Sequence, residues 1–176
     1  TYLSSNQFAA GAVAVLSQSG NLAIELDRLF ASRGLGISRF VSLGNQADVG
    51  VVELIEACAA DPATSAIAVY IEDFRDGRGF VDAAAAAVRS GTPVVVLAAG
   101  ASTAAARGAQ SHTGSLTSDS AVITAACELS GAIAVHTPRE LANVLLALKQ
   151  QAVPRGRRVA VLTDGGGHGV IACDVA

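Results

Sequence analysis

Short apolar runs alternate with amphipathic stretches along the first 149 residues. Runs rich in Val, Ile, Leu and Ala predict five strands, at residues 12–16, 37–43, 66–71, 94–97 and 132–135. Because these runs are mostly continuous in apolar residues, we expect strands that are buried on both faces. Between them, apolar residues recur at helical spacing. The alternation predicts an α/β fold in which helices cover both faces of a parallel sheet with flavodoxin-like winding.

The helices are predicted from apolar spacing and from residues suited to their ends. The expected ranges are 22–30, 51–59, 79–89, about 120–129, and a last helix with apolar positions from 141 to 148. Asp48 is expected to cap the second helix, and Asp119 or Ser120 the fourth. Thr137 and Pro138 suit the N-cap and first turn of the last one.

A polar, basic segment at residues 150–158 predicts a linker between two units. Residues 1–149 would form the flavodoxin-like domain. Residues 159–176 repeat its opening pattern, an apolar strand at 159–162, a glycine-rich turn and a helix, and so predict the start of a second, truncated domain of this kind. Both ends look cut, so we expect a piece of a longer protein.

Composition narrows the classes of function. The net charge is −3 with no basic run, which disfavours nucleic acid as a partner. No apolar run approaches the roughly 20 residues that cross a bilayer. The three cysteines are odd in number and widely spaced, which disfavours a disulfide framework and fits the cytoplasm.

The candidate catalytic residue is His112, which lies in a segment of small and polar residues that includes Ser111, Thr113 and Gly114. A histidine in such a loop is a nucleophile, a general base, a metal ligand or a plain loop residue. His136 and His168 show no ligand spacing relative to it, so we expect no metal site in this chain.

Ligands of open parallel sheets bind at the carboxyl ends of the strands, and four polar stretches fall there. Two of them lead directly into helices, whose first N–H groups can hold an anion. One contains Ser17, Gln18, Ser19 and Gly20; the other contains Gly165, Gly166, Gly167 and Gly169. Each is alternatively an ordinary turn.

Glu72, after the third strand, is either a helix-cap carboxylate or an orienter of an imidazole. Neither a Walker loop nor a clean G-x-G-x-x-G is present.

Four motifs together give the chain a family resemblance. They are VLSQSG at 15–20, SLGNQAD at 42–48, YIE at 70–72 with DGR at 76–78, and SHTG at 111–114. In this order the chain resembles the NDP-forming acyl-CoA synthetases, above all the ADP-forming acetyl-CoA synthetases, and more distantly the succinyl-CoA synthetase α subunit. The resemblance implies the same flavodoxin-like fold and extends over almost the whole sequence.

The resemblance implies roles for individual residues. His112 would be phosphorylated and carry the phosphoryl group, and Glu72 would support its imidazole. Phosphate contacts would come from Ser17, Gln18, Ser19, Gly20, Ser111, Thr113 and Gly114 on one side. The opposing helix start would supply Gly165, Gly166, Gly167 and Gly169.

The resemblance also implies a reaction, in which acyl-CoA, NDP and phosphate are interconverted with acid, CoA and NTP. CoA would bind mainly to an N-terminal Rossmann domain, and ATP or ADP with Mg²⁺ to an ATP-grasp domain or subunit, both outside this chain. The fragment alone would be inactive, and the complete protein a cytoplasmic oligomer. The alternative is a regulatory, ligand-sensing domain of a related protein fused to an acetyltransferase.

The chain departs from the family pattern in two places. Ala98, Ala99 and Ala101 occupy a stretch where a basic residue is usual, and Asp164 and His168 replace a common asparagine and proline. A third interpretation is a flavodoxin-like domain that binds flavin or carries a signalling phosphate. Flavin is disfavoured because the chain has no tryptophan and two tyrosines, and a phospho-acceptor aspartate because no acidic cluster follows the first strand.

Overall fold

The protein contains a five-stranded parallel sheet, seen in a computed structural model that describes residues 8–98, 120–150, 156 and 158–176. The strands are β1 (Ala10–Ser17), β2 (Ile37–Ser42), β3 (Ala66–Ile71), β4 (Val94–Ala98) and β5 (Ile133–Val135). Their spatial order is β2-β1-β3-β4-β5, with every neighbouring pair parallel. This arrangement confirms the predicted fold class.

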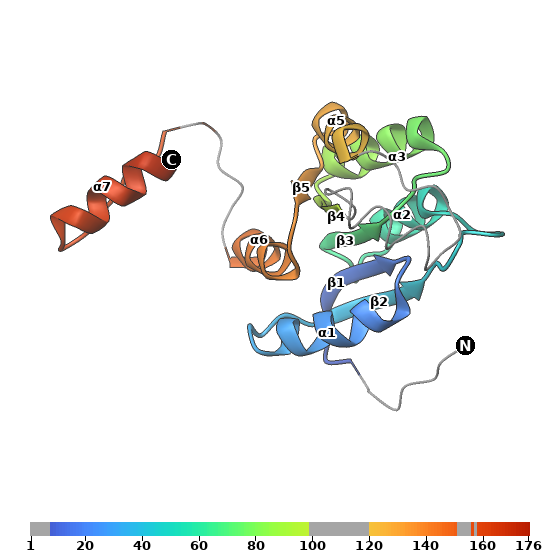
Figure 1. Ribbon diagram of the computed structural model, residues 1–176. Helices are drawn as coiled ribbons and strands as arrows, with labels where there is room; N and C mark the ends of the chain where they lie inside the picture. Colours follow the sequence, from blue (N-terminus) through green and yellow to red (C-terminus); the bar gives the residue numbers. More distant parts are fainter. Residues whose placement is uncertain (1–7, 99–119, 151–155, 157) are drawn as a thin grey trace.

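Helices cover both faces of the sheet (Figure 1). One face carries α1 (Gly20–Ala31) and α6 (Pro138–Gln150). The other carries α2 (Val51–Ala60), α3 (Gly77–Arg89) and α5 (Ser120–Ser130). Because side chains alternate along a strand, β3 sends Ile67, Val69 and Ile71 toward the second set and Ala66, Ala68 and Tyr70 toward the first.

The start of α2 differs from the sequence prediction. Its N-cap is Gly50 and not Asp48. The Glu53 carboxylate accepts a hydrogen bond from the Gly50 N–H at 3.1 Å, and the Gln46 Oε1 accepts one from the Val51 N–H at 2.8 Å. The helix therefore obtains its acceptors from its own first turn and from the preceding loop, and Asp48 lies too early to serve. Thr137 does accept from the Glu140 N–H at 3.1 Å, as predicted for α6.

The C-terminal segment agrees with prediction only in part. Helix α7 (Gly166–Val175) is present as predicted, but it begins at Gly166, inside the predicted glycine-rich turn, and it buries none of its residues. Residues 159–162 form no strand, and Val159 and Leu162 are exposed. A strand needs a neighbour for its backbone hydrogen bonds, and this segment has none among the described residues. In Figure 1, α7 lies apart from the sheet. The linker and the second domain stay predictions.

Within the residues that the structure describes, no helix is long and apolar enough to cross a membrane. The three cysteines are free thiols, Cys58 and Cys127 buried and Cys173 exposed. No disulfide links the described residues, and the fold is stabilised by two apolar clusters, one on each face of the sheet.

The Cys127 thiol should make stability fall at alkaline pH. Burial, followed by the charge of Glu128, raises the pKa of Cys127 from 9.0 to about 11. A pKa raised by folding stabilises the protein below pH 9, and this contribution is lost as the pH rises toward 11. The loss amounts to about 2–3 kcal/mol at most. Urea unfolding from pH 8 to 11 should therefore show a steeper decline for the wild type than for Cys127→Ala. Parallel curves would contradict this assignment.

Candidate functional site

The carboxyl ends of β2, β1 and β3 lie side by side at one edge of the sheet. Ser17 at the end of β1 pairs with Ser42 of β2 on one side and with Tyr70 of β3 on the other. The loops that follow these strands therefore meet at this edge, as the sequence predicted. His112, with Ser111, Thr113 and Gly114, lies outside the described residues, so their predicted roles stay predictions.

Glu72 is the buried acid of this edge. It follows β3 directly and is 7% exposed, although it carries a carboxylate. The Tyr70 hydroxyl donates a hydrogen bond to Glu72 Oε1 at 3.0 Å. Glu72 Oε2 is buried and has no hydrogen-bond partner among the residues described. Because an unpaired buried carboxylate oxygen is costly, this atom marks a place that suits an N–H or O–H donor.

The side chain of Gln18 holds the Glu72 loop by its backbone. Gln18 Oε1 accepts hydrogen bonds from the Glu72 N–H and, at 3.1 Å, from the Asp73 N–H. Gln18 Nε2 donates to the Asp73 carbonyl at 3.2 Å, and the Gln18 N–H donates to the Tyr70 carbonyl at 3.1 Å. The structure thus places this carboxamide, predicted to face a phosphate, on the loop that carries Glu72.

Gln46, between β2 and α2, brings a second carboxamide to the loop that carries Glu72, and no role was predicted for it. It is 4% exposed and has a left-handed backbone, with φ of 51°. Its Nε2 donates to the Asp73 carbonyl at 2.8 Å while its Oε1 accepts from the Val51 N–H. Its own carbonyl accepts from Arg75 Nη1 at 3.1 Å. The SLGNQAD motif drew attention to the segment, but nothing in the motif indicates that Gln46 is buried.

Replacing Gln46 by methionine should destabilise the fold by about 1–3 kcal/mol, because the Val51 N–H loses its acceptor in a buried place. Methionine keeps the length and most of the volume of glutamine, so the change isolates the hydrogen bonds. Urea unfolding measures the loss. The matched control is Asn143→Leu on α6, where the side chain is exposed and accepts a surface hydrogen bond from Arg33 Nε at 3.3 Å. That variant should stay within about 0.5 kcal/mol. Equal stabilities of wild type and Gln46→Met would contradict the prediction.

The turn before α1 is organised by its two serines. The Ser17 hydroxyl donates to the Ser19 carbonyl at 2.7 Å and accepts from the Ser19 N–H at 3.1 Å. Ser19 is the N-cap, and its hydroxyl accepts from the Leu22 N–H at 3.4 Å. The N–H groups of Gly20 and Asn21 have no acceptor within a helix at this position. The turn therefore shows the serine capping expected of an ordinary strand-to-helix turn, and it also presents N–H groups that suit an anion.

The second predicted anion site lies elsewhere. Gly165 is the N-cap of α7, and Gly166, Gly167 and Gly169 lie in the first turns of this helix. This turn is largely exposed, and the structure does not bring it next to the start of α1 (Figure 1). Among the described residues, no group of three or more His, Cys, Asp or Glu side chains could hold a metal ion.

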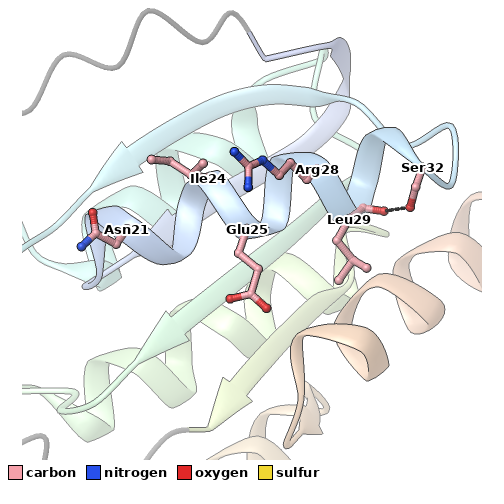
Figure 2. A pocket seen from close by; sticks show the side chains of 6 residues that line it. All are labelled: Asn21, Ile24, Glu25, Arg28, Leu29 and Ser32. Atoms are coloured by element: carbon pink, nitrogen blue, oxygen red, sulfur yellow. Dashed lines mark hydrogen bonds between the residues drawn. The ribbon is translucent and has the colours of Figure 1, made fainter.

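A depression of about 520 Å³ follows the outer side of α1 and does not belong to this edge of the sheet. Figure 2 shows its lining, which comes from a single helix: Asn21, Ile24, Glu25, Arg28, Leu29 and Ser32. The Ser32 hydroxyl donates to the Leu29 carbonyl at 2.8 Å within that helix. Since every lining residue in the described part of the chain belongs to this one helix, the depression is helix surface and not an enclosed binding site.

Comparison with known proteins gives consistent matches. A family model described as "Succinyl-CoA ligase like flavodoxin domain" matches residues 10–148. The α subunit of the ADP-forming acetate–CoA ligase II of Pyrococcus furiosus is 38% identical over 164 residues, which are 93% of this chain and 35% of that protein. The ADP-forming acetate–CoA ligase I of Archaeoglobus fulgidus is 39% identical over 165 residues, 93% of this chain and 24% of that protein.

The fold also matches solved structures. The dinucleotide-forming acetyl-coenzyme A synthetase 1 of Ca. Korarchaeum cryptofilum, in complex with phosphate and ADP, is 36% identical with a TM-score of 0.87. The match covers 96% of this chain and 36% of that one. An ATP citrate lyase of Methanosaeta concilii, 17% identical with a TM-score of 0.58, shares the fold over 94% of this chain and 29% of its own. The chain thus spans about a third of the length of these relatives, or less.

Proposed function

Because the chain belongs to the family of succinyl-CoA ligase-like flavodoxin domains, we propose that it is part of an NDP-forming acyl-CoA synthetase. Such an enzyme interconverts acyl-CoA, NDP and phosphate with acid, CoA and NTP. The relatives named as ADP-forming acetate–CoA ligases support this reaction class. In the proposal, His112 carries the phosphoryl group between the two half-reactions.

The observation that carries the proposal is the unpaired oxygen of Glu72. Asp61 Oδ2, the other buried side-chain oxygen without a hydrogen bond among the described residues, lies 2.9 Å from Arg39 and so has a charged partner. Glu72 Oε2 has no such partner within residues 8–98, 120–150, 156 and 158–176. A carboxylate in this position can accept the N–H of an imidazole, which fixes the tautomer and leaves the other ring nitrogen free to attack.

The sheet topology supports His112 as the source of that imidazole. In the register of β3 and β4, Ile71 pairs with Ala98. Glu72 is the next residue after Ile71, and the chain continues from Ala98 toward His112. Strand β4, after which the sequence continues to His112, therefore ends beside the strand that precedes Glu72.

Phosphate first attacks the thioester carbon of acyl-CoA, so that a C–O bond forms, the C–S bond breaks, CoA leaves and an acyl phosphate results. Two phosphoryl transfers follow. The neutral imidazole nitrogen of His112 attacks the phosphorus of an acyl phosphate, so that an N–P bond forms, the P–O bond breaks and the carboxylate leaves. Glu72 accepts the remaining ring N–H and stabilises the positive charge that the ring gains. The terminal oxygen of NDP then attacks the same phosphorus, an O–P bond forms and the N–P bond breaks. The N–H groups at the start of α1 offer hydrogen bonds to the phosphoryl oxygens.

The other components belong to further domains or subunits of the complete protein. We assign CoA to a Rossmann domain and the nucleotide, with its Mg²⁺, to an ATP-grasp domain. The glycine turn of residues 165–169 would face the phosphohistidine from a second flavodoxin-like domain. We place the assembled oligomer in the cytoplasm. The short coverage of the relatives, about a third or less, supports the need for these additional parts.

Labelling of the full-length protein tests the proposal. Incubation with acetyl-CoA and [³²P]phosphate, or with Mg²⁺ and [γ-³²P]ATP, should produce a protein-bound label that is lost in acid and kept in base, as a phosphorylated imidazole requires. Mass spectrometry should place it on the peptide that contains His112. The absence of label under both conditions, or a label on another residue, would overturn the proposal.

A further inference from the structure

Tyr70 contacts the acid of the proposed site directly, and no role has yet been assigned to it. Its ring is partly buried and packs against the apolar cluster under α1 and α6. Its hydroxyl donates to one oxygen of Glu72, at 3.0 Å, while the other oxygen is buried and unpaired in the described part of the chain. We propose that Tyr70 is a positioning residue for phosphoryl transfer, which holds Glu72 Oε1 so that Oε2 accepts the imidazole N–H of His112. This inference rests on the proposed function.

The need for such a group follows from the freedom of a glutamate side chain. The terminal torsion of glutamate is broad, so the two carboxylate oxygens exchange places easily unless one is held. The Gln18 carboxamide fixes the backbone N–H of Glu72, and the Tyr70 hydroxyl fixes the carboxylate at the other end of the side chain. With both ends of the residue held, Glu72 Oε2 keeps a fixed position from which it can accept a hydrogen bond from the imidazole.

The hydroxyl of Tyr70 is suited to donate and not to act as a second base. Burial, followed by the charge of Glu72 and by the hydrogen bond to it, raises the pKa of Tyr70 well above its ordinary value of 10.0. The phenol therefore keeps its proton throughout the neutral range. It supplies a hydrogen bond without adding a charge beside the phosphoryl group, and so it orients Glu72 without repelling the anion.

The test compares Tyr70→Phe with the wild type in the full-length protein. Single-turnover phosphorylation with Mg²⁺ and [γ-³²P]ATP should slow by about 10-fold, by analogy with the low end of the loss seen when a residue that orients a metal-binding side chain is removed. In steady-state turnover, kcat should fall while the KM values for acyl-CoA and NDP stay within about twofold, because ground-state binding is unchanged. A wild-type phosphorylation rate, or a rise in KM with kcat intact, would overturn the inference.

Two further variants separate positioning from loss of stability. Thr64→Val removes another buried hydroxyl, which bonds to the Ser38 hydroxyl at 2.8 Å before β3, at the opposite end of the sheet. It should cost a similar amount of stability and leave phosphorylation unchanged. In a Glu72→Gln background, Tyr70→Phe should change the rate by less than about twofold, since the carboxylate it positions is gone. Equal effects of Tyr70→Phe in both backgrounds would contradict the inference.

The two levels of the hypothesis fail in different ways. If the wild type takes up label on a residue other than His112, or takes up none, the proposed function is wrong. If His112 is labelled and Tyr70→Phe is labelled equally fast, the proposed function stands and the role of Tyr70 is wrong.

Discussion

Replacing His112 by asparagine in the full-length protein should lower the turnover of acyl-CoA by roughly 10³-fold or more, the scale seen when a covalent nucleophile is removed. Asparagine retains a polar side chain of similar reach but has no nitrogen that can take a phosphoryl group. The same variant should take up no acid-labile label from [γ-³²P]ATP. Steady-state assays in both directions measure the effect, since the carrier serves both half-reactions.

The control for this variant is His136→Asn. His136 is exposed on the loop between β5 and α6. Its backbone N–H donates a hydrogen bond to Glu140 Oε2 at 2.8 Å, and this bond does not involve the imidazole. This variant should keep wild-type turnover. If His112→Asn kept more than about 1% of wild-type turnover, its loss would be far smaller than the roughly thousandfold loss expected for a nucleophile. That result would indicate direct transfer without a phosphohistidine.

Replacing Phe80 by alanine should destabilise the fold by about 3–5 kcal/mol, the usual cost of emptying a buried phenylalanine site. Phe80 lies in the first turns of α3, is fully buried, and its ring centroid is 4.3 Å from that of Phe74. Both rings belong to the apolar cluster between the sheet and helices α2, α3 and α5. Urea unfolding followed by circular dichroism measures the loss.

Leu129→Ala is the matched control for this large-to-small change. Leu129 is 76% exposed on α5, so its truncation removes little buried surface and should change stability by no more than about 0.5 kcal/mol. If both variants lost the same free energy, the packing of α3 on the sheet would be less important than its burial indicates. Because the Glu72 loop leads into α3, a loosened helix should also slow phosphorylation in the complete protein.

The fold was predictable because its signal is repeated many times along the chain. Five apolar runs separated by helical patterns leave few arrangements other than a parallel sheet covered on both faces, and the structure confirms the β2-β1-β3-β4-β5 order. Glu72 was identified by its place after a strand and by the family resemblance. Its burial agrees with a special role but was not visible in the sequence.

The details that the sequence did not supply depend on contacts between separate loops. Gln18 and Gln46 are 28 positions apart, and both bind the backbone of a third loop at Asp73. Local propensity carries no information about such a meeting point. The cap of α2 was misplaced at Asp48 for the same reason, since Gln46 supplies an acceptor from the loop. Residues 159–162 have strand-like composition but no adjacent strand to pair with, so composition alone was misleading there.

The carboxamide contacts at Asp73 have a consequence for a reaction in which negative charge arrives and departs. Gln18 and Gln46 are neutral at every pH at which the protein is folded, and amide hydrogen bonds respond weakly to ionic strength. A lysine in either place would be attracted by each arriving phosphoryl group, and a carboxylate would be repelled by it. A scaffold of uncharged amides keeps its geometry through the whole cycle, so the electrostatic work falls on the phosphoryl group and the residues that touch it.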